Sequence, residues 1–517
     1  MIEIWFFVHL LVSLHENGKL NKIIINKKNM NKNELKPAVV FEQFAKINRI
    51  PRPSKREEKM IAYLKEWGES HGLETKVDET GNVIIRKPAT PGMENRKTVI
   101  LQSHMDMVCD KLVDYEIDFD TDPIKTYIDG EWLTAEGTTL GADDGIGCAI
   151  ELALLESSDI QHGPIECVFT RDEETGLTGA EGMKAGFMTG DFLINLDSED
   201  EGEIFVSCAG GRNTTAVFTF ERFDLNVDSL FFMRGQLKGL VGGHSGDDIN
   251  KKRANAIKIL GRFLYQEYNK YENEVFLVRF DSGKMHNAIP RDGSFVIAVP
   301  KSRKEDVMAD WNVFASQVEE EFCVTDTQMV WNMESVSPEP YLDVRVARNF
   351  IFALQAVDNG IYSICQDPAL NGMVETSSNI ASIETKDHEI VIVSSQRSNV
   401  MSNLDNMCAT IGACFRLAGA EVRHSDGYPA WKMRSNSELQ KIVIDSYKKL
   451  FHKDPVVRGI HAGLECGLFS ERYPNLDMVS FGPTLRFVHT PDERLHIPTV
   501  QMVWDHLIDV LKNIPAQ

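Results

Sequence analysis

The 517-residue sequence has few of the features that mark secreted, membrane-spanning or nucleic-acid-binding proteins. Its nine cysteines are an odd number without any CxxC spacing and lie mostly in apolar segments, so we expect reduced thiols and a cytoplasmic protein. The apolar stretch at residues 1–14 is too short to span a bilayer. Lys and Arg number 55 against 77 Asp and Glu, a formal net charge of −22. We therefore expect neither a nucleic-acid nor a membrane partner.

Length and composition indicate a globular protein with more than one domain. The chain is 43% apolar and 26% charged, which is ordinary for globular proteins, and 517 residues are too many for one core. The first residues carry Glu3 where a signal peptide has basic side chains, and a Lys- and Asn-rich segment without periodicity follows. We expect residues 1–34 to be an N-terminal extension outside the fold.

The hydrophobic pattern divides the remaining chain into two kinds of region. Before residue 213 and after residue 427, buried-strand patterns alternate with helical ones, which predicts strands at 98–102, 165–170, 192–196 and 478–481 and helices at 145–157, 439–451 and 499–511. Between these parts the pattern predicts strands at 214–220 and 275–280 and helices at 255–268 and 304–322. The expected fold class is α/β, with a catalytic α/β/α domain in two segments, 35–212 and 428–517, and an inserted α+β lid domain, 213–427.

Carboxylates and a histidine lie at the ends of the strands predicted before residue 213. They are His104 and Asp106, the run Asp172–Glu174, and Asp197, with Asp143 and Asp144 preceding the predicted helix. The ends of parallel strands share one sheet edge, so these side chains can converge there. Acids gathered at such an edge repel one another unless a cation lies among them. The pattern predicts a divalent metal site, with zinc favoured over manganese or cobalt, and two ions bridged by a carboxylate fit best.

Each of these residues also has a simpler interpretation. The run from Asp172 to Glu174 is compatible with a solvated loop, and His104 with a hydrogen-bonded core histidine. The DGIG sequence after Asp143 is compatible with a helix start capped by Asp144. Their occurrence on successive strand ends favours the metal site.

Nine motifs in series resemble those of the dinuclear-zinc exopeptidases, and most closely the cytosolic dipeptidases of the peptidase D type, the aminoacyl-histidine dipeptidases. The resemblance runs from about Leu35 to the C-terminus. The motifs are SHMDMV, GTTLGADDGIG, TRDEETGLTGA, NLDSED, GGHSGDDI, MHNAIPR, VETSSN, HAGLECG and FVHTPDE. The resemblance implies a two-domain zinc exopeptidase that hydrolyses dipeptides, including Xaa-His, with a metal-activated water.

The resemblance also implies a role for each residue of the metal site. One zinc is bound by His104 and Asp197 and the other by Glu174 and His489, with Asp143 as the bridge, and the peptide from Asp143 to Asp144 is cis. Glu173 corresponds to the general base, which takes a proton from the water and delivers it to the leaving amine. Asp106 corresponds to the carboxylate that orients His104.

Further residues are expected to bind the substrate. By the resemblance, His244 is the donor that stabilises the developing oxyanion, although its Gly-rich motif is equally typical of an exposed turn. Arg397 suits a free C-terminal carboxylate because its guanidinium binds bidentately, with a surface ion pair as the alternative. The supporting contacts expected are Asn287, Ser378, Asn379 and His461, the last also compatible with a structural role. Cys466 raises the alternative of a thiol nucleophile, which the metal residues disfavour.

The expected substrate is a short peptide, and other activities stay open. An N-acyl amino-acid deacylase or a tripeptidase would use the same scaffold, and a binding protein without catalysis is an alternative of another class. For assembly, a homodimer through the lid domain and a pseudo-dimer within one chain are both compatible with the sequence.

Overall fold

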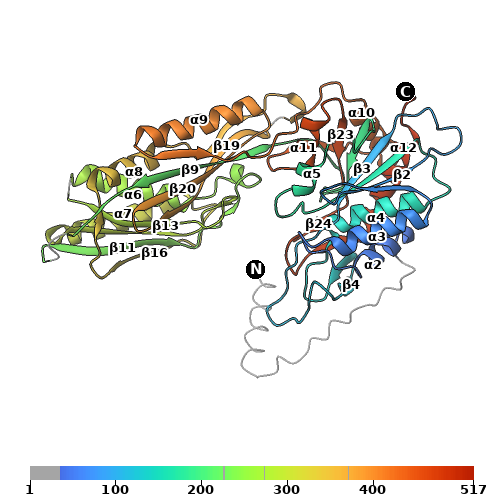
Figure 1. Ribbon diagram of the computed structural model, residues 1–517. Helices are drawn as coiled ribbons and strands as arrows, with labels where there is room; N and C mark the ends of the chain where they lie inside the picture. The colour runs from blue at the N-terminus through green and yellow to red at the C-terminus, as the bar shows by residue number, and fades with distance from the viewer. Residues whose placement is uncertain (1–34, 225–227, 273, 371) are drawn as a thin grey trace, which may run out of the picture.

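The computed structural model describes residues 35–224, 228–272, 274–370 and 372–517. The extension expected at residues 1–34 lies outside them. Figure 1 shows two lobes connected by long strands. The first lobe contains both ends of the described chain, and the second is formed by its middle part. Among the described residues, no helix is both long and apolar enough to cross a membrane.

The first lobe is built on a mixed sheet of eight strands. Their order is β1 (Glu74–Val77), β2 (Val83–Lys87), β6 (Ile165–Thr170), β3 (Val99–His104), β7 (Phe192–Asn195), β23 (Asp477–Ser480), β8 (Glu203–Cys208) and β22 (Val456–Ile460). The neighbours β6, β3, β7 and β23 run parallel to one another. The carboxyl ends of these four strands therefore lie along one edge, where the expected metal residues follow them.

Helices cover both faces of this sheet. One core cluster joins it to α2 (Ala38–Ile47), α3 (Glu58–Ser70), α4 (Ala142–Glu156), α10 (Glu438–Phe451) and α12 (Ile497–Lys512), and another joins it to α5 (Thr178–Gly182) and α11 (Glu465–Arg472). Successive strand residues alternate between the faces, so Val99 and Leu101 pack in the first cluster and Ile100 in the second. The expected α/β/α arrangement is confirmed.

The second lobe combines an antiparallel sheet with helices. The strand order is β16 (Val330–Ser335), β11 (Leu230–Lys238), β15 (Gly293–Pro300), β13 (Phe276–Ser282), β19 (Val374–Thr385), β20 (Glu389–Ser398), β9 (Gly210–Thr219) and β21 (Glu421–His424), and β18 (Gly360–Ile364) pairs with β19. One core cluster unites this sheet with α6 (Ala256–Lys270), α7 (Lys304–Glu321), α8 (Val344–Ala356) and α9 (Met401–Leu417). Aromatic packing anchors it, with the Trp311 ring 4.9 Å from Phe263 and 5.7 Å from Phe295.

Smaller sheets complete the two lobes. A four-stranded sheet in the first lobe contains β24 (Leu485–Arg486), β25 (Arg494–His496), β5 (Trp132–Ala135) and β4 (Thr126–Asp129). The second lobe has the pairs β12 (Gly243–His244) with β14 (Ala288–Ile289) and β10 (Arg222–Phe223) with β17 (Tyr341–Leu342). Short 3₁₀ turns lie at Ile249–Lys251, Lys301–Arg303 and Pro368–Leu370.

The two connections between the lobes run side by side. Cys208 bridges to Trp431 and Gly211 bridges to Tyr428, both antiparallel. Strand β9 begins at Gly210 because its first residues pair with β20, so it starts four residues before the predicted strand. Likewise β3 continues past the predicted end at residue 102, because His104 still pairs with Thr170 of β6. The first expected metal ligand is therefore held by a strand.

Truncating a buried side chain in the core of the first lobe should lower the free energy of unfolding. Leu152 on α4 is fully buried in the first core cluster, so Leu152→Ala should lower the free energy of unfolding by about 2–5 kcal/mol, as burial is lost and a cavity remains. The matched control is Leu417→Ala at the end of α9, where Leu417 is 90% exposed and a change within about 0.5 kcal/mol is expected. Denaturant titration of both variants measures the difference. Equal losses would contradict this account of the core.

Candidate metal centre

The residues expected to bind metal converge at the carboxyl edge of the first sheet. His104 is the last residue of β3, and Asp197 follows β7 by two residues. Glu174 lies in the loop after β6, and Asp143 lies in the first turn of α4. His489 lies in the loop between β24 and β25. Five segments far apart in the sequence therefore place one side chain each in the same space.

Asp143 lies between two histidines and points one carboxylate oxygen at each. Its Oδ1 is 3.0 Å from Nε2 of His104, and its Oδ2 is 3.1 Å from Nε2 of His489. On one side, Asp197 Oδ1 lies 3.6 Å from Nε2 of His104. On the other, Glu174 Oε2 lies 3.0 Å from Nε2 of His489. The five side chains thus form two groups of three potential ligands, and Asp143 belongs to both.

The spacing of these atoms fits metal coordination. Ligands at the usual zinc distances of about 2.0–2.2 Å lie roughly 3.4 Å from one another around a tetrahedral ion. The separations of 3.0–3.6 Å observed here agree with that value. In addition, Glu174 Oε1 is buried without a hydrogen-bond partner among the described residues. The donor set of two imidazoles and three carboxylates therefore fits two divalent cations.

The charges of the group also call for a cation. Burial raises the pKa of Asp197 well above its ordinary value, and the charge of Asp143 raises it further, against the opposing effect of His104. Burial and then the charge of Asp143 likewise raise the pKa of Glu174. Cations among these carboxylates would favour their ionised forms.

Asp106 orients three residues of the site at once. Its Oδ1 lies 3.3 Å from Nδ1 of His104 and accepts the backbone N–H of Glu173 at 3.1 Å. Its Oδ2 accepts the backbone N–H of Glu174 at 3.4 Å and the hydroxyl of Ser54 at 2.8 Å. The carboxylate is fully buried, and its contacts fix the ring of His104 and the start of the loop after β6.

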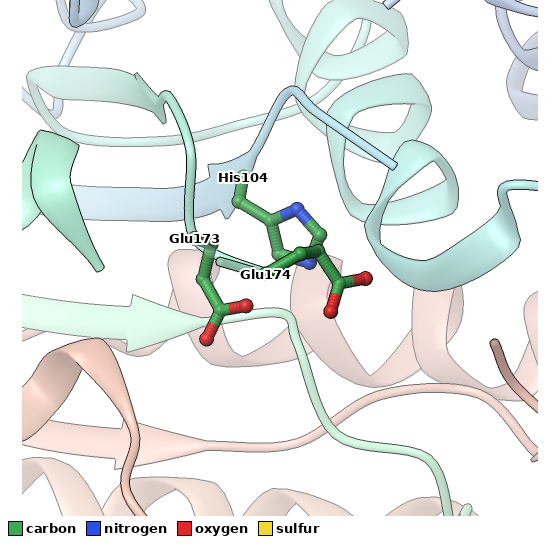
Figure 2. A group of neighbouring side chains, drawn as sticks. All are labelled: His104, Glu173 and Glu174. Carbon is green, nitrogen blue, oxygen red and sulfur yellow. The ribbon is translucent and has the colours of Figure 1, made fainter. Parts of the chain in front are cut away.

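Glu173 and Glu174 direct their carboxylates into the space beside the His104 ring, as Figure 2 shows. Glu173 takes no part in either of the two groups that share Asp143. Burial raises the pKa of the Glu173 carboxyl well above its ordinary value, and the charge of Asp197 adds to this against that of His104. A carboxylate with a raised proton affinity next to the candidate metal ligands is suited to accept a proton.

Asp172 shapes the loop instead of facing the cation site. It is buried and adopts a left-handed conformation with φ of 49°. Its carboxylate accepts the hydroxyl of Thr178 at 2.5 Å and that of Thr175. These bonds close a tight turn, which explains the third acid of the run without a metal.

The start of α4 combines a candidate metal ligand with a side chain that caps the regular part of the helix. The peptide bond between Asp143 and Asp144 is cis, as the resemblance implied, and neither residue has helical dihedral angles. Asp144 Oδ1 accepts the backbone N–H of Gly147 at 3.1 Å. The capping role considered for Asp144 is therefore observed, next to an Asp143 that faces the histidines.

A cleft between the lobes opens onto these residues. Two adjoining compartments, of about 410 and about 490 Å³, share Glu173, Glu174 and His244 in their walls. Nδ1 of His244 accepts the backbone N–H of Asp247 at 3.1 Å, and Nε2 of the same ring lies 3.2 Å from Nη2 of Arg397. Burial, and then the charge of Arg397, lowers the pKa of His244 to about 4. His244 is thus a neutral ring in the wall of the cleft, beside Arg397.

Arg397 is buried in the wall of the larger compartment, which excludes the surface ion pair considered for it. Its Nη1 donates to the hydroxyl of Tyr428 at 2.7 Å, and its Nη2 donates to that of Ser245 at 3.3 Å. No carboxylate lies within ion-pair distance among the described residues, and Nε has no partner there. The sequence reasoning missed Tyr428 and Ser245, because neither has a motif of its own for this role. A buried cation without a counter-ion is suited to bind an anion.

The other expected substrate contacts divide into two sets. Asn287 lines the same compartment as Arg397, whereas Ser378 and Asn379 do not line either compartment. Ser378 accepts a hydrogen bond from Gln396 at 3.3 Å, and Asn379 donates to the carbonyl of Ala288 at 2.9 Å.

Alternation along β19 accounts for the orientation of Ser378. Successive side chains of a strand point to opposite faces, so the preceding residue, Ser377, is the one whose hydroxyl lies 2.7 Å from Nε2 of His461. Burial, and then the charges of Arg397 and His244, lowers the pKa of His461 to about 3, so this ring is neutral.

Cys466 lies within the core of the first lobe and does not line the cleft. Burial raises the pKa of its thiol well above the ordinary value. A nucleophilic thiolate is therefore disfavoured at this position.

Comparisons with known proteins agree with this geometry. The model of peptidase family M20/M25/M40 matches residues 100–513. The cytosol non-specific dipeptidase of Escherichia coli (strain K12) is 40% identical over 485 residues, which cover 94% of this chain and 99% of the relative.

Two solved structures extend the comparison. An aminoacylhistidine dipeptidase from Vibrio alginolyticus is 42% identical, with a TM-score of 0.85 and coverage of 94% of this chain and 99% of that chain. An aminopeptidase PepT from Bacillus cereus shares 17% identity, a TM-score of 0.55 and the same coverages, which shows a common fold. The chain described here belongs to peptidase family M20/M25/M40.

Proposed function

We propose that this protein is a metal-dependent dipeptidase that hydrolyses short peptides, including dipeptides of the Xaa-His type. The observation that carries the proposal is the position of Asp143, with one carboxylate oxygen directed at His104 and the other at His489. The names of the relatives from E. coli and V. alginolyticus, a non-specific dipeptidase and an aminoacylhistidine dipeptidase, support the substrate class. The former name also supports a cytoplasmic location.

Two divalent ions, zinc or alternatively manganese or cobalt, are the proposed cofactors. His104 and Asp197 would hold one ion, Glu174 and His489 would hold the other, and Asp143 belongs to both sets of side chains. When bound, the ions supply the activation of a water molecule and the polarisation of the scissile carbonyl. Asp106 keeps the ring of His104 and the backbone of Glu174 in place for this.

Proton transfer and charge stabilisation fall to residues that are not ligands. Glu173 Oε atoms take the proton of the attacking water and deliver it to the amine of the departing residue. His244 donates its Nε2–H to the oxygen that becomes negative in the transition state. Nδ1 accepts the backbone N–H of Asp247, and the role requires Nε2 to exchange its contact with Nη2 of Arg397, at 3.2 Å, for the substrate oxygen.

The C-terminal carboxylate of the substrate is proposed to pair with Arg397. The guanidinium is buried and lacks a carboxylate partner in the described part of the chain, so an incoming anion would balance its charge. Asn287 lines the same compartment and is the proposed additional contact, and His461 supports the wall through Ser377. A carboxylate held at this place selects peptides with a free C-terminus.

The second lobe, expected to span residues 213–427, is proposed to act as a lid and as the surface for a homodimer. It contributes His244 and Arg397 to the cleft of the first lobe. Its strand β18 leaves apolar side chains exposed, Ile361, Tyr362 and Ile364, which supports an interface there.

A substrate panel tests the proposed function. Metal-depleted protein should be inactive, and added Zn, Mn or Co should restore cleavage of dipeptides, including Xaa-His, because the ligand set holds divalent ions. Liquid chromatography of the products measures the cleavage. Preference for tripeptides or N-acetyl amino acids would indicate one of the other amide hydrolases, and no metal-restored cleavage of any dipeptide would contradict the proposal.

Glu173→Gln separates the general base from the ligands. The amide cannot accept the proton, so kcat should fall by about 10²–10⁴-fold while the protein keeps its metal content. Elemental analysis and steady-state kinetics measure the two quantities. Glu181→Gln, which alters another glutamate lining the cleft, serves as the matched control with kcat close to that of the wild type. Loss of metal from Glu173→Gln would instead make Glu173 a ligand.

Arg397→Lys tests recognition of the free carboxylate. The bidentate contact is lost, so kcat/KM for dipeptides should fall by about 10- to 100-fold, whereas the already low kcat/KM for C-terminal amides should change little. Arg212 lines the same compartment but is paired with Asp405 at 2.7 Å, so Arg212→Lys is the matched control. An equal loss for acids and amides in Arg397→Lys would remove the proposed carboxylate contact.

A further inference from the structure

We propose that Glu493 and Arg52 are positioning residues that hold the loop before α4 from two sides, so that Asp143 can reach both metal ions. The inference deepens the proposed function and rests on the metal centre that it requires. Neither residue lines the cleft, so neither is expected to touch the substrate.

Glu493 binds four consecutive backbone N–H groups. Its Oε2 accepts from Leu140 at 2.7 Å and Gly141 at 3.0 Å, and its Oε1 accepts from Ala142 at 2.8 Å and Asp143 at 3.3 Å. The residue is only 2% exposed. An ionised carboxylate has four acceptor positions and no donor, so it alone among the side chains of this size satisfies all four groups.

These N–H groups need an acceptor from elsewhere in the chain. The first N–H groups of a helix have no partner within it, and here the helical path is interrupted at Asp143 and Asp144. Gly141 occupies the N-cap position and has no side chain that could cap the helix. Glu493 takes this role from 350 positions further along the sequence than Asp143.

Arg52 holds the same loop through its carbonyl groups. Its Nη2 donates to the carbonyl of Gly141 at 2.6 Å, and its Nη1 donates to that of Asp106 at 3.0 Å. Arg52 is 1% exposed and has no carboxylate within ion-pair distance among the described residues. Burying a guanidinium whose only partners are backbone carbonyls and a side-chain amide costs free energy. Its presence here therefore indicates that it serves to hold the loop.

Gly141 is held from both sides by these two charges. Its N–H bonds to Glu493 and its C=O to Arg52, and the opposite charges of the two side chains act on one residue. The φ angle of Gly141 is +67°, and a Cβ atom there would lie 2.6 Å from Nη2 of Arg52. The loop therefore has a single tightly fitted path two residues before Asp143.

The two contacts also tie the loop to the other parts of the metal centre. Glu493 lies four residues beyond the ligand His489, and the carbonyl bound by Arg52 belongs to Asp106, which orients His104. The bridging ligand is thereby linked to the histidine on each of its sides. Such support fixes the ligands before the ions bind, and its loss typically costs 10- to 100-fold in metal affinity.

Metal titration of Glu493→Gln tests the inference. The amide has one acceptor oxygen and a donor where N–H groups point, so at least two of the four bonds are lost. Competition with a chromophoric chelator should show zinc or manganese affinity weakened by about 10- to 100-fold, with normal circular dichroism of the metal-free protein. Arg52→Lys keeps the charge but loses the fork between two carbonyls, and it should weaken metal binding in the same direction.

Glu166→Gln is the matched control. Glu166 is also 2% exposed and accepts the N–H groups of Thr189 at 2.7 Å and Gly190 at 3.2 Å, but it lies near the start of β6, away from the metal edge. This variant should lower the melting temperature of the metal-free protein and leave metal affinity unchanged. Equal affinity losses in Glu166→Gln and Glu493→Gln would reduce the effect to general destabilisation and overturn the inference.

Metal affinity is measured without a substrate, which keeps the two proposals separate. If both Glu493→Gln and Arg52→Lys bind metal with wild-type affinity, the inference is overturned. The proposed dipeptidase function would not be affected by that result. If Glu493→Gln fails to fold, the metal affinity of Arg52→Lys is compared with that of Glu166→Gln, and this comparison tests the inference. A wild-type protein that binds two ions but cleaves no dipeptide would refute the proposed function and leave the positioning role supported by the affinities.

Discussion

Repulsion between buried carboxylates is the constraint on which the arrangement of this site depends. Asp143, Glu174 and Asp197 lie together at one sheet edge, and burial raises the pKa of the last two. Burial alone would raise the pKa of Asp143 as well, but hydrogen bonds from His104 and His489 outweigh it and lower the value. The group is thus built to hold negative charge around positive charge, which a pair of divalent ions supplies.

The fold meets this constraint in part by holding the loop that carries Glu174 from behind. Asp106 holds the loop after β6 and the ring of His104, and Asp172 closes the turn that follows Glu174. The inserted lobe adds a donor and a cation, His244 and Arg397, at the opposite wall of the cleft. One side of the site is therefore formed by the rigid strand ends of the first lobe. The other side is formed by the second lobe, which two adjacent connections join to the first.

The sequence predicted the strand ends and the side chains that converge there, but not the register of the second lobe. Strand β6 spans the predicted residues 165–170, because a mostly apolar run, interrupted by Glu166, lies between turn residues. In β19, by contrast, the prediction chose Ser378, and the structure turns Ser377 toward His461, because a motif does not reveal to which face of the sheet each residue points. Arg52 and Glu493 act on backbone groups, which leave no pattern in a single sequence.

Anomalous diffraction from metal-loaded crystals, collected at the absorption edge of the bound metal, tests the central claim most directly. The account predicts two peaks about 3.5–4 Å apart, one beside His104 and Asp197 and one beside His489 and Glu174, with Asp143 in contact with both. A single peak, or two peaks of which one lies away from Asp143, would contradict the bridged pair of ions.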